Sequence, residues 1–128
     1  MSSKEAVRTE SAPAPFQGAP YSQAIVAGGL VFVSGQVGLR PDAPGVEGDI
    51  TEQTEQVLSN IAAILEAAGS SLDKLVKTTV FLQNLADFAA MNDVYARFAG
   101  STPPARSTVE VAKLPAGALV EIEAIALR

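Results

Sequence analysis

The chain has 128 residues, the length of a single domain, and a chain of this size buries a substantial core when it folds. It contains neither cysteine nor histidine, which excludes disulfides, thiol nucleophiles, Ser-His and Cys-His catalytic arrangements and the usual zinc sites. Nine basic and fourteen acidic residues give a net charge of −5, and without a basic cluster this charge predicts no binding to nucleic acid.

The N-terminal segment is polar and contains two closely spaced prolines. Residues 1–15 carry Pro13 and Pro15, which predicts a flexible tail ahead of a single domain over residues 16–128. The tail has no apolar segment behind its basic residues, and no apolar run in the chain approaches the ~20 residues that cross a membrane. These features predict a cytoplasmic protein without membrane association.

The first predicted element is a β-hairpin. Ile25–Ala27 and Leu30–Val33 are β-rich runs on either side of Gly28 and Gly29, and a Gly-Gly pair accepts the positive φ angles of a tight hairpin turn. A loop rich in glycine and proline follows over residues 38–48.

Two amphipathic helices are predicted further along the chain. The first runs over Thr51–Ala68, where Asp49 or Thr51 caps its start and Gly69 ends it. The second runs over Leu85–Phe98. The apolar residues predicted on its inner stripe are Phe88, Met91, Val94, Tyr95 and Phe98.

Three further strands complete the predicted order β-β-α-β-α-β-β. They are Val76–Leu82 between the helices, followed by Ser107–Ala112 and Leu119–Leu127 at the end of the chain. This order favours an α+β fold with a single mixed sheet and both helices packed on one face, because two amphipathic helices cover only one side of a sheet.

The last predicted strand is apolar on both sides. Leu119, Ile125 and Leu127 project from the side opposite the helices, beside Glu121 and Glu123. Because a partly apolar sheet face needs cover, this pattern favours burial against another copy of the same chain.

The strongest candidates for chemistry lie near the C-terminus. Arg106 follows a rigid Pro103-Pro104 loop. A guanidinium held there can bind a carboxylate through two parallel hydrogen bonds, because its planar shape matches that anion. The alternative is an ordinary surface arginine, since most arginines are solvated. Glu121 and Glu123 are two apart in a strand and therefore share a face. They either position a water or act as acid and base, or they belong to a solvated strand face, and the spacing does not say which glutamate would point into a site.

Four segments are together characteristic of one family. They are APYSQA (19–24), VFVSGQVG (31–38), LSNIAAILEAAGSSLDKLVKTTVFLQNLADFAAMNDVY (58–95) and PPARSTVEVAKLPAGALVEIEAIA (103–126). On these segments the chain, from about residue 12 onward, resembles the reactive intermediate deaminase A family, RidA, also called YjgF. The resemblance implies a chorismate-mutase-like α+β fold that assembles as a homotrimer, with helices outside and an active site at each subunit interface.

The resemblance also implies an activity and its residues. Members hydrolyse short-lived 2-imino and enamine acids, such as 2-aminoacrylate, 2-iminopropanoate and 2-iminobutanoate, to 2-keto acids and ammonia without a cofactor or metal. Arg106 matches the arginine that holds the substrate carboxylate, and Glu121 matches the glutamate that orients the attacking water. The residues that match the lining or support of the pocket are Tyr21, Ser34, Gly35 and Asn92, which on their own would suggest only packing, turn or outer-face residues.

Two functions of different classes follow from this sequence. The first is the imine and enamine deaminase. The second is a non-catalytic trimeric member of the same fold that binds a small carboxylate or acts like a chaperone. A retained Arg106 suits both functions, whereas Glu121 as a water-holding residue favours the enzyme. Ribonuclease activity has also been attached to the family, but the acidic charge and the missing histidine disfavour it here.

Overall fold

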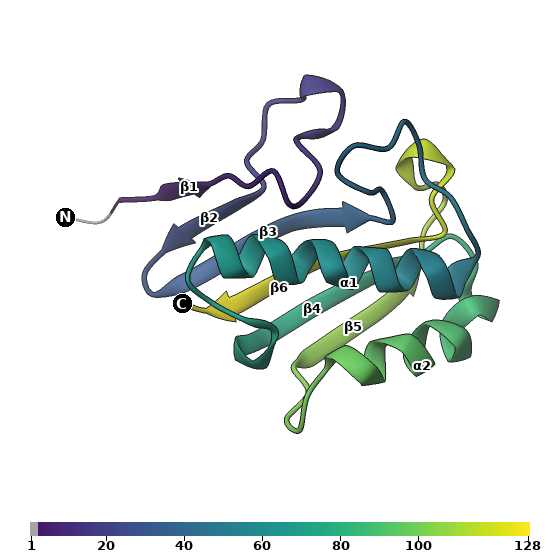
Figure 1. Ribbon diagram of the computed structural model, residues 1–128. Coiled ribbons are helices and arrows are strands. Elements are labelled where there is room, and N and C mark those ends of the chain that lie inside the picture. The colour runs from purple at the N-terminus through teal and green to yellow at the C-terminus, as the bar shows by residue number, and fades with distance from the viewer. Residues whose placement is uncertain (1–2) are drawn as a thin grey trace.

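The structure, a computed structural model, describes residues 3–128 as one six-stranded sheet with two α-helices on one face (Figure 1). The strands are β1 (Glu5–Val7), β2 (Ala24–Ala27), β3 (Leu30–Val37), β4 (Leu75–Leu82), β5 (Ala105–Glu110) and β6 (Val120–Leu127). The helices are α1 (Ile50–Ala67) and α2 (Phe88–Phe98). The strand order is β1-β2-β3-β6-β4-β5, with only the β4–β5 pair parallel, which confirms the predicted α+β fold with a mixed sheet. No helix within the described residues is both long enough and apolar enough to cross a membrane.

The N-terminal segment, for which the sequence predicted a flexible tail over residues 1–15, contributes the strand β1 to the sheet. β1 pairs antiparallel with β2, and Val7 and Ala12 are buried in the core. The side chain of Gln23 fixes the segment that follows, because its Nε2 donates to the carbonyls of Thr9 and Pro13 and its Oε1 accepts from the Thr9 N–H. The β1–β2 backbone pairing and the buried side-chain amide of Gln23 order this segment. Neither interaction produces an apolar pattern that can be recognised in the sequence. Residues 1 and 2 lie outside the described part of the chain.

The predicted hairpin is confirmed, but its second strand is longer than expected. Gly28 and Gly29 occupy the turn with φ of 57° and 77°. β3 does not end at Val33, because pairing with β6 resumes at Gln36 after a change of register. This irregularity is a β-bulge, which lets one strand carry extra residues without ending.

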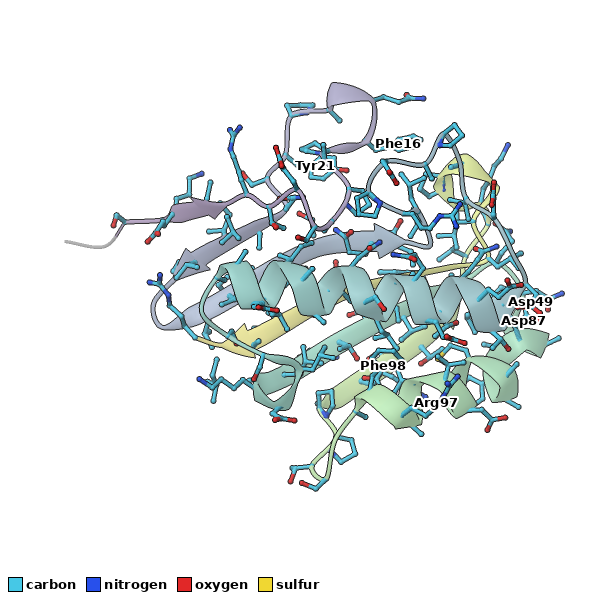
Figure 2. All side chains as sticks on the ribbon, viewed as in Figure 1. Phe16, Tyr21, Asp49, Asp87, Arg97 and Phe98 are labelled. Carbon is cyan, nitrogen blue, oxygen red and sulfur yellow. The ribbon has the colours of Figure 1, made fainter. Side chains whose placement is uncertain are left out.

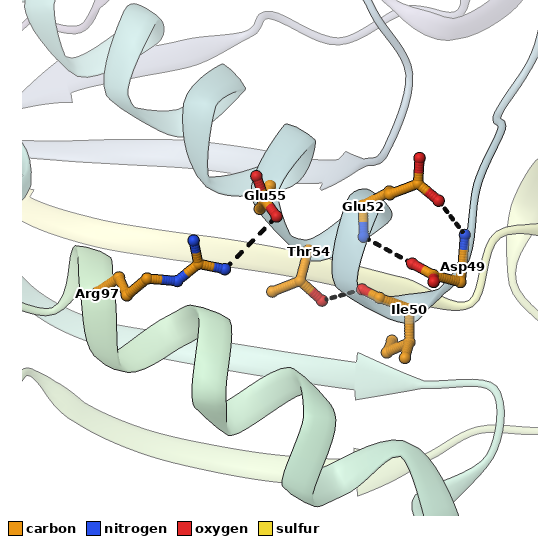
Figure 3. Close-up of polar contacts among 6 residues, drawn as sticks. All are labelled: Asp49, Ile50, Glu52, Thr54, Glu55 and Arg97. Carbon is orange, nitrogen blue, oxygen red and sulfur yellow. Dashed lines mark hydrogen bonds and ion pairs between the residues drawn. The ribbon is translucent and has the colours of Figure 1, made fainter.

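Helix α1 begins where its cap residues predict. The Asp49 side chain accepts a hydrogen bond from the Glu52 N–H at 2.9 Å, and the Glu52 carboxylate accepts one from the Asp49 N–H at 3.2 Å (Figure 3). This reciprocal pair satisfies two backbone donors that the first helical turn leaves free. An exposed ion pair between Arg97 of α2 and Glu55 of α1, at 3.4 Å, links the two helices and contributes little to stability because water screens it.

Helix α2 is shorter than the predicted helix, and one of its residues faces elsewhere. A 3-10 turn over Leu85–Asp87 precedes it. Met91 and Val94 are buried against the core as expected, but Phe88 is 41% exposed and is not on the inner stripe. Phe88 is the first residue of α2, and its ring lies near the side chain of Arg106 on the edge strand β5 rather than in the core.

The sheet face opposite the helices is uncovered in the single chain. On β6, Ile122 and Ala124 are buried under the helices, while Glu121 and Ile125 on the other side are only partly buried. Phe32 on the same open face is 41% exposed. The alternation predicted for the last strand is therefore confirmed.

Candidate active site

The β-bulge in β3 and the neighbouring β6 build one side of the site. Glu121 of β6 pairs with Val37 of β3 and Phe81 of β4, and it faces the open side of the sheet. It lines a groove of about 620 Å³. The residues around this groove include Phe16, Tyr21, Ser34, Gly35, Pro115 and Glu121. The structure therefore brings Tyr21, Ser34 and Gly35 together with Glu121, four residues far apart in the sequence.

Gly35 in the bulge allows the Glu121 carboxylate to lie against the backbone. A Cβ atom added at Gly35 would come within 2.6 Å of Glu121 Oε2 and 2.9 Å of Glu121 Cδ. Separations of that size do not occur between real side chains, so any larger residue at this position displaces the carboxylate. Absence of a side chain at Gly35 thus sets the position of Glu121.

The environment of Glu121 favours its protonated form. Burial raises the pKa of the Glu121 carboxyl above its ordinary value, and the negative charge of Glu123 two residues later raises this pKa further. A carboxyl whose pKa is moved toward neutrality both accepts and releases a proton more readily near neutral pH. Of the two glutamates that the sequence left equivalent, Glu121 is the one with these properties.

Tyr21 and Ser34 hold the loop that forms the upper wall of the groove. The Tyr21 hydroxyl accepts a hydrogen bond of 2.6 Å from the Phe16 N–H, which closes the loop on itself (Figure 2). The Ser34 hydroxyl donates to the Ser22 carbonyl at 2.6 Å, which ties the same loop to β3. Both hydroxyls therefore maintain the shape of the groove.

Two strained turns border the groove, and sequence reasoning missed the strain in both. The turn at Phe16–Gly18 places Gln17 at φ 53°, and the turn at Pro115–Gly117 places Ala116 at φ 58°. These are the two non-glycine residues with positive φ within residues 3–128. Such strain concentrates at functional sites, where the surrounding structure enforces it. The two turns share one sequence feature, because Gly-Ala directly follows the strained residue in each.

Arg106 lies in a second location, at the edge of the sheet. It is the second residue of β5, which begins two residues earlier than predicted, and it pairs with Thr78 of β4. Its Cζ lies 4.8 Å from the centroid of the Tyr95 ring and 5.6 Å from that of Phe88. No ion pair joins this guanidinium to another residue in the described part of the chain. The charge is therefore stacked on rings but not neutralised.

Two unsatisfied polar atoms accompany Arg106 on the α2 side of the sheet. The Oδ1 atom of Asn92 on α2 and the Oγ1 atom of Thr108 on β5 are buried and have no hydrogen-bond partner among residues 3–128. Buried polar atoms without a protein partner are uncommon, and an ordered water or another bound group commonly satisfies them. Thr108 was not predicted, although its position two residues after Arg106 on a strand places both on one face.

The two locations do not meet within one chain. Arg106 shares the face of Thr78, which is buried beneath the helices, whereas Glu121 faces the open side. Their strands are separated by β4, and along the register Arg106 aligns with Ala124 rather than with Glu121. The single chain thus carries two half-sites, one around Glu121 and one around Arg106.

The side chains at the two half-sites suit a small organic ligand better than a metal ion. Among residues 3–128, no three Asp or Glu side chains converge as metal ligands, and the chain has no His or Cys. An unpaired guanidinium and one carboxylate with a raised pKa suit a small organic anion whose reaction requires proton transfer.

The fold and the two half-sites together define the class of this protein. It is a small α+β protein whose mixed sheet carries two helices on one face, the Glu121 carboxylate against Gly35 on the other face, and Arg106 at the edge.

The family model described as Endoribonuclease L-PSP matches residues 9–128. A RutC family protein of Pyrococcus horikoshii is 53% identical over 126 residues, which is 98% of each chain. The chloroplastic Reactive Intermediate Deaminase A of Arabidopsis thaliana is 50% identical over 124 residues, covering 96% of this chain and 65% of that protein. The chain belongs to the RidA family, also named YjgF or L-PSP, which confirms the resemblance found in the sequence.

Solved structures agree with this assignment. The YjgF gene product of E. coli has a TM-score of 0.91 and 44% identity, and the alignment covers 97% of this chain and 98% of that one. E. coli TdcF, solved with bound serine, also has a TM-score of 0.91, with 40% identity and coverage of 97% and 98%.

Proposed function

We propose that this protein is a cofactor-free hydrolase that converts 2-iminobutanoate, 2-iminopropanoate and their enamine forms to 2-keto acids and ammonia. The observation that supports the proposal is that one chain carries both an arginine without an ion pair and a groove carboxylate whose pKa is raised, on opposite faces of the sheet. This chain is 50% identical to a Reactive Intermediate Deaminase A.

Arg106 supplies the binding contact. A 2-imino acid carries a carboxylate next to the reactive C=N carbon, and two parallel N–H donors of a guanidinium fix both its position and its plane. The serine bound to TdcF is a related molecule, with a carboxylate and a nitrogen on adjacent carbons. Tyr21, Ser34 and Gly35 shape the wall against which the small substrate lies, and Asn92, whose Oδ1 is buried in the single chain, supports the site on the α2 side.

Glu121 handles the water and the protons. Its carboxylate accepts a proton from a water as the water oxygen bonds to C2 of the protonated imine, and the electron pair of C=N moves to nitrogen to give a neutral carbinolamine. Glu121 then returns its proton to nitrogen, and the C–N bond breaks to release ammonia. The hydroxyl proton passes to the Glu121 carboxylate as C=O forms, and Glu121 gives it up to the released ammonia. A raised pKa suits a group that both takes and gives this proton. An enamine must first be protonated at C3.

The half-sites require assembly to meet. We propose a homotrimer in which Arg106 of one subunit completes the Glu121 groove of the next. Exposed Phe32 and half-buried Ile125 on the open sheet face support this arrangement, because that face has no helix to cover it.

The trimer is tested by its mass. Light scattering after size exclusion is expected to give roughly three times 13.2 kDa. Ile125→Asp places a charge on the open face, so we expect it to yield a folded monomer without activity, while Ser59→Asp on the exposed side of α1 remains trimeric and active. A wild-type monomer with full activity would contradict a shared site.

The activity is tested in a coupled assay. Threonine dehydratase with threonine releases the unstable imine, and 2-ketobutyrate is expected to appear faster when this protein is added. No acceleration over the spontaneous rate would instead support the non-catalytic carboxylate-binding alternative. A labelled RNA should stay intact in a parallel incubation, since a net charge of −5 repels the phosphate backbone.

Gly35→Ala is expected to lower turnover about ten- to a hundredfold, because the new Cβ displaces the Glu121 carboxylate by about an ångström. Gly45→Ala is the matched control, since a Cβ at that glycine meets nothing within 4 Å. Initial rates of both variants check the prediction, and a Gly35→Ala enzyme as fast as Gly45→Ala would refute the role of the close approach.

A further inference from the structure

The guanidinium of Arg106 lies against two aromatic rings, that of the exposed Phe88 and that of Tyr95, which belongs to the core. Tyr95 lies two turns after Phe88 on α2, and both rings are within the range of cation–π attraction, at 4.8 and 5.6 Å from Arg106 Cζ. Phe88 is 41% exposed at the start of α2, so its ring is not enclosed by the core and one side of it meets the Arg106 guanidinium. Contact with Arg106 accounts for its placement.

The Tyr95 ring is fixed relative to the strand that carries Arg106. Its hydroxyl shares a buried hydrogen bond of 2.7 Å with the hydroxyl of Thr78. Thr78 is the direct partner of Arg106 in the register of β4 and β5. The ring, the strand and the guanidinium therefore form one connected unit.

The rings hold the guanidinium without occupying its hydrogen-bond donors. An aromatic face attracts the cation but accepts none of its in-plane N–H groups, whereas a carboxylate would take two of them. The nearest acidic residue along the same side of β5, Glu110, has its Oε1 bonded to the Leu85 N–H at 2.8 Å. The free edge of Arg106 thus stays available for an incoming anion.

We propose that Phe88 and Tyr95 form an aromatic shelf that positions Arg106 for planar, two-point binding of a carboxylate. Both are positioning residues, since they act through the arginine. The inference rests on the proposed function, in which that anion is the carboxylate of the 2-imino acid. By ordering a long flexible side chain in advance, the shelf reduces the conformational entropy that binding would otherwise lose.

The test compares variants that remove a ring with variants that keep it. Phe88→Leu removes an exposed ring and Phe88→Tyr restores one. Tyr95→Leu and Tyr95→Phe both lose the hydroxyl bonded to Thr78, but only the leucine loses the ring. Leu85→Ala, at a position 47% exposed just before α2, is the control for loss of an exposed apolar side chain.

Binding of 2-ketobutyrate by calorimetry, KM and kcat, and thermal melts are measured on the full-length protein. We expect each ring-removing variant to weaken 2-ketobutyrate binding and raise KM about three- to tenfold, with a smaller change in kcat. Phe88→Tyr and Leu85→Ala should bind as the wild type does, and the melt of Phe88→Leu should be unchanged. Tyr95→Phe should lose less affinity than Tyr95→Leu, because it keeps the ring and loses only the hydroxyl bonded to Thr78.

Two results separate this inference from the function on which it rests. If Arg106→Ala no longer binds 2-ketobutyrate while Phe88→Leu and Tyr95→Leu bind it with the wild-type affinity, the positioning role of the two rings is refuted and the proposed function stands. If Arg106→Ala itself binds 2-ketobutyrate as the wild type does, the carboxylate site, and with it the proposed function, is wrong.

Discussion

Arg106→Ala is expected to slow deamination of 2-iminobutanoate by at least about one to two powers of ten while the protein stays folded and trimeric. So small a substrate offers little besides its carboxylate for the protein to hold. Loss of a charge-assisted contact costs about 1.5–3 kcal/mol or more, or roughly one to two powers of ten in rate. Because Arg106 forms no ion pair with the rest of the described chain, its removal leaves no buried partner charge and little reason to unfold.

Arg106→Lys is the informative companion to this variant. Lysine keeps the positive charge, but it offers a point contact in place of a planar fork and loses the contact of the guanidinium with the Phe88 and Tyr95 rings. We therefore expect it to remain badly impaired. The measurement is the initial rate on 2-iminobutanoate generated in situ, together with a melt and the mass of each variant. Near-normal turnover by Arg106→Ala would show that this arginine is an ordinary surface residue.

Glu121→Gln should also have a large effect, slowing the catalysed rate while making the protein more stable at neutral pH. The amide cannot accept the proton of the attacking water, so the chemical step loses its base. The pKa of Glu121 is raised in the folded protein by burial and then by Glu123, so the folded state prefers the neutral form. The stability this group contributes is fully present below its unfolded pKa and is lost as pH rises through the raised folded pKa.

The stability gain of Glu121→Gln therefore depends on pH in a defined direction. Its thermal midpoint should exceed that of the wild type at about pH 7 and approach it at about pH 3, where the wild-type carboxyl is protonated in both states. Glu123→Gln is the control, because Glu123 is exposed and its removal only relieves repulsion. A Glu121→Gln protein that is equally stabilised at both pH values would show that packing, and not ionisation, is responsible.

Local sequence signals predicted the regular elements well. The capping residues around Asp49 and the apolar repeat behind them located α1 to within a residue at each end. Gly28 and Gly29 located the hairpin turn. Strand β1 and the continuation of β3 past Val33 escaped prediction, because pairing with a distant strand orders them rather than any local pattern of side chains.

The candidate residues were predictable by type, and for most of them through the family resemblance, but their arrangement was not. Phe88 reads as a core residue in the helical repeat, and only the position of β5 beside the start of α2 turns it toward Arg106. The strain at Gln17 and Ala116 likewise has no residue-level signature beyond a following glycine.

By itself, the sequence determined the fold class, the absence of thiol and imidazole chemistry, and the family through which Arg106 and Glu121 were singled out. Only the tertiary structure decided that Gly35 lies against Glu121, that burial distinguishes Glu121 from Glu123, and that Arg106 lies on the other side of the sheet. The physical reason is that periodicity and capping act between residues a few positions apart. Desolvation, close approach and the direction of a strand face instead depend on which distant segments the folded sheet places side by side.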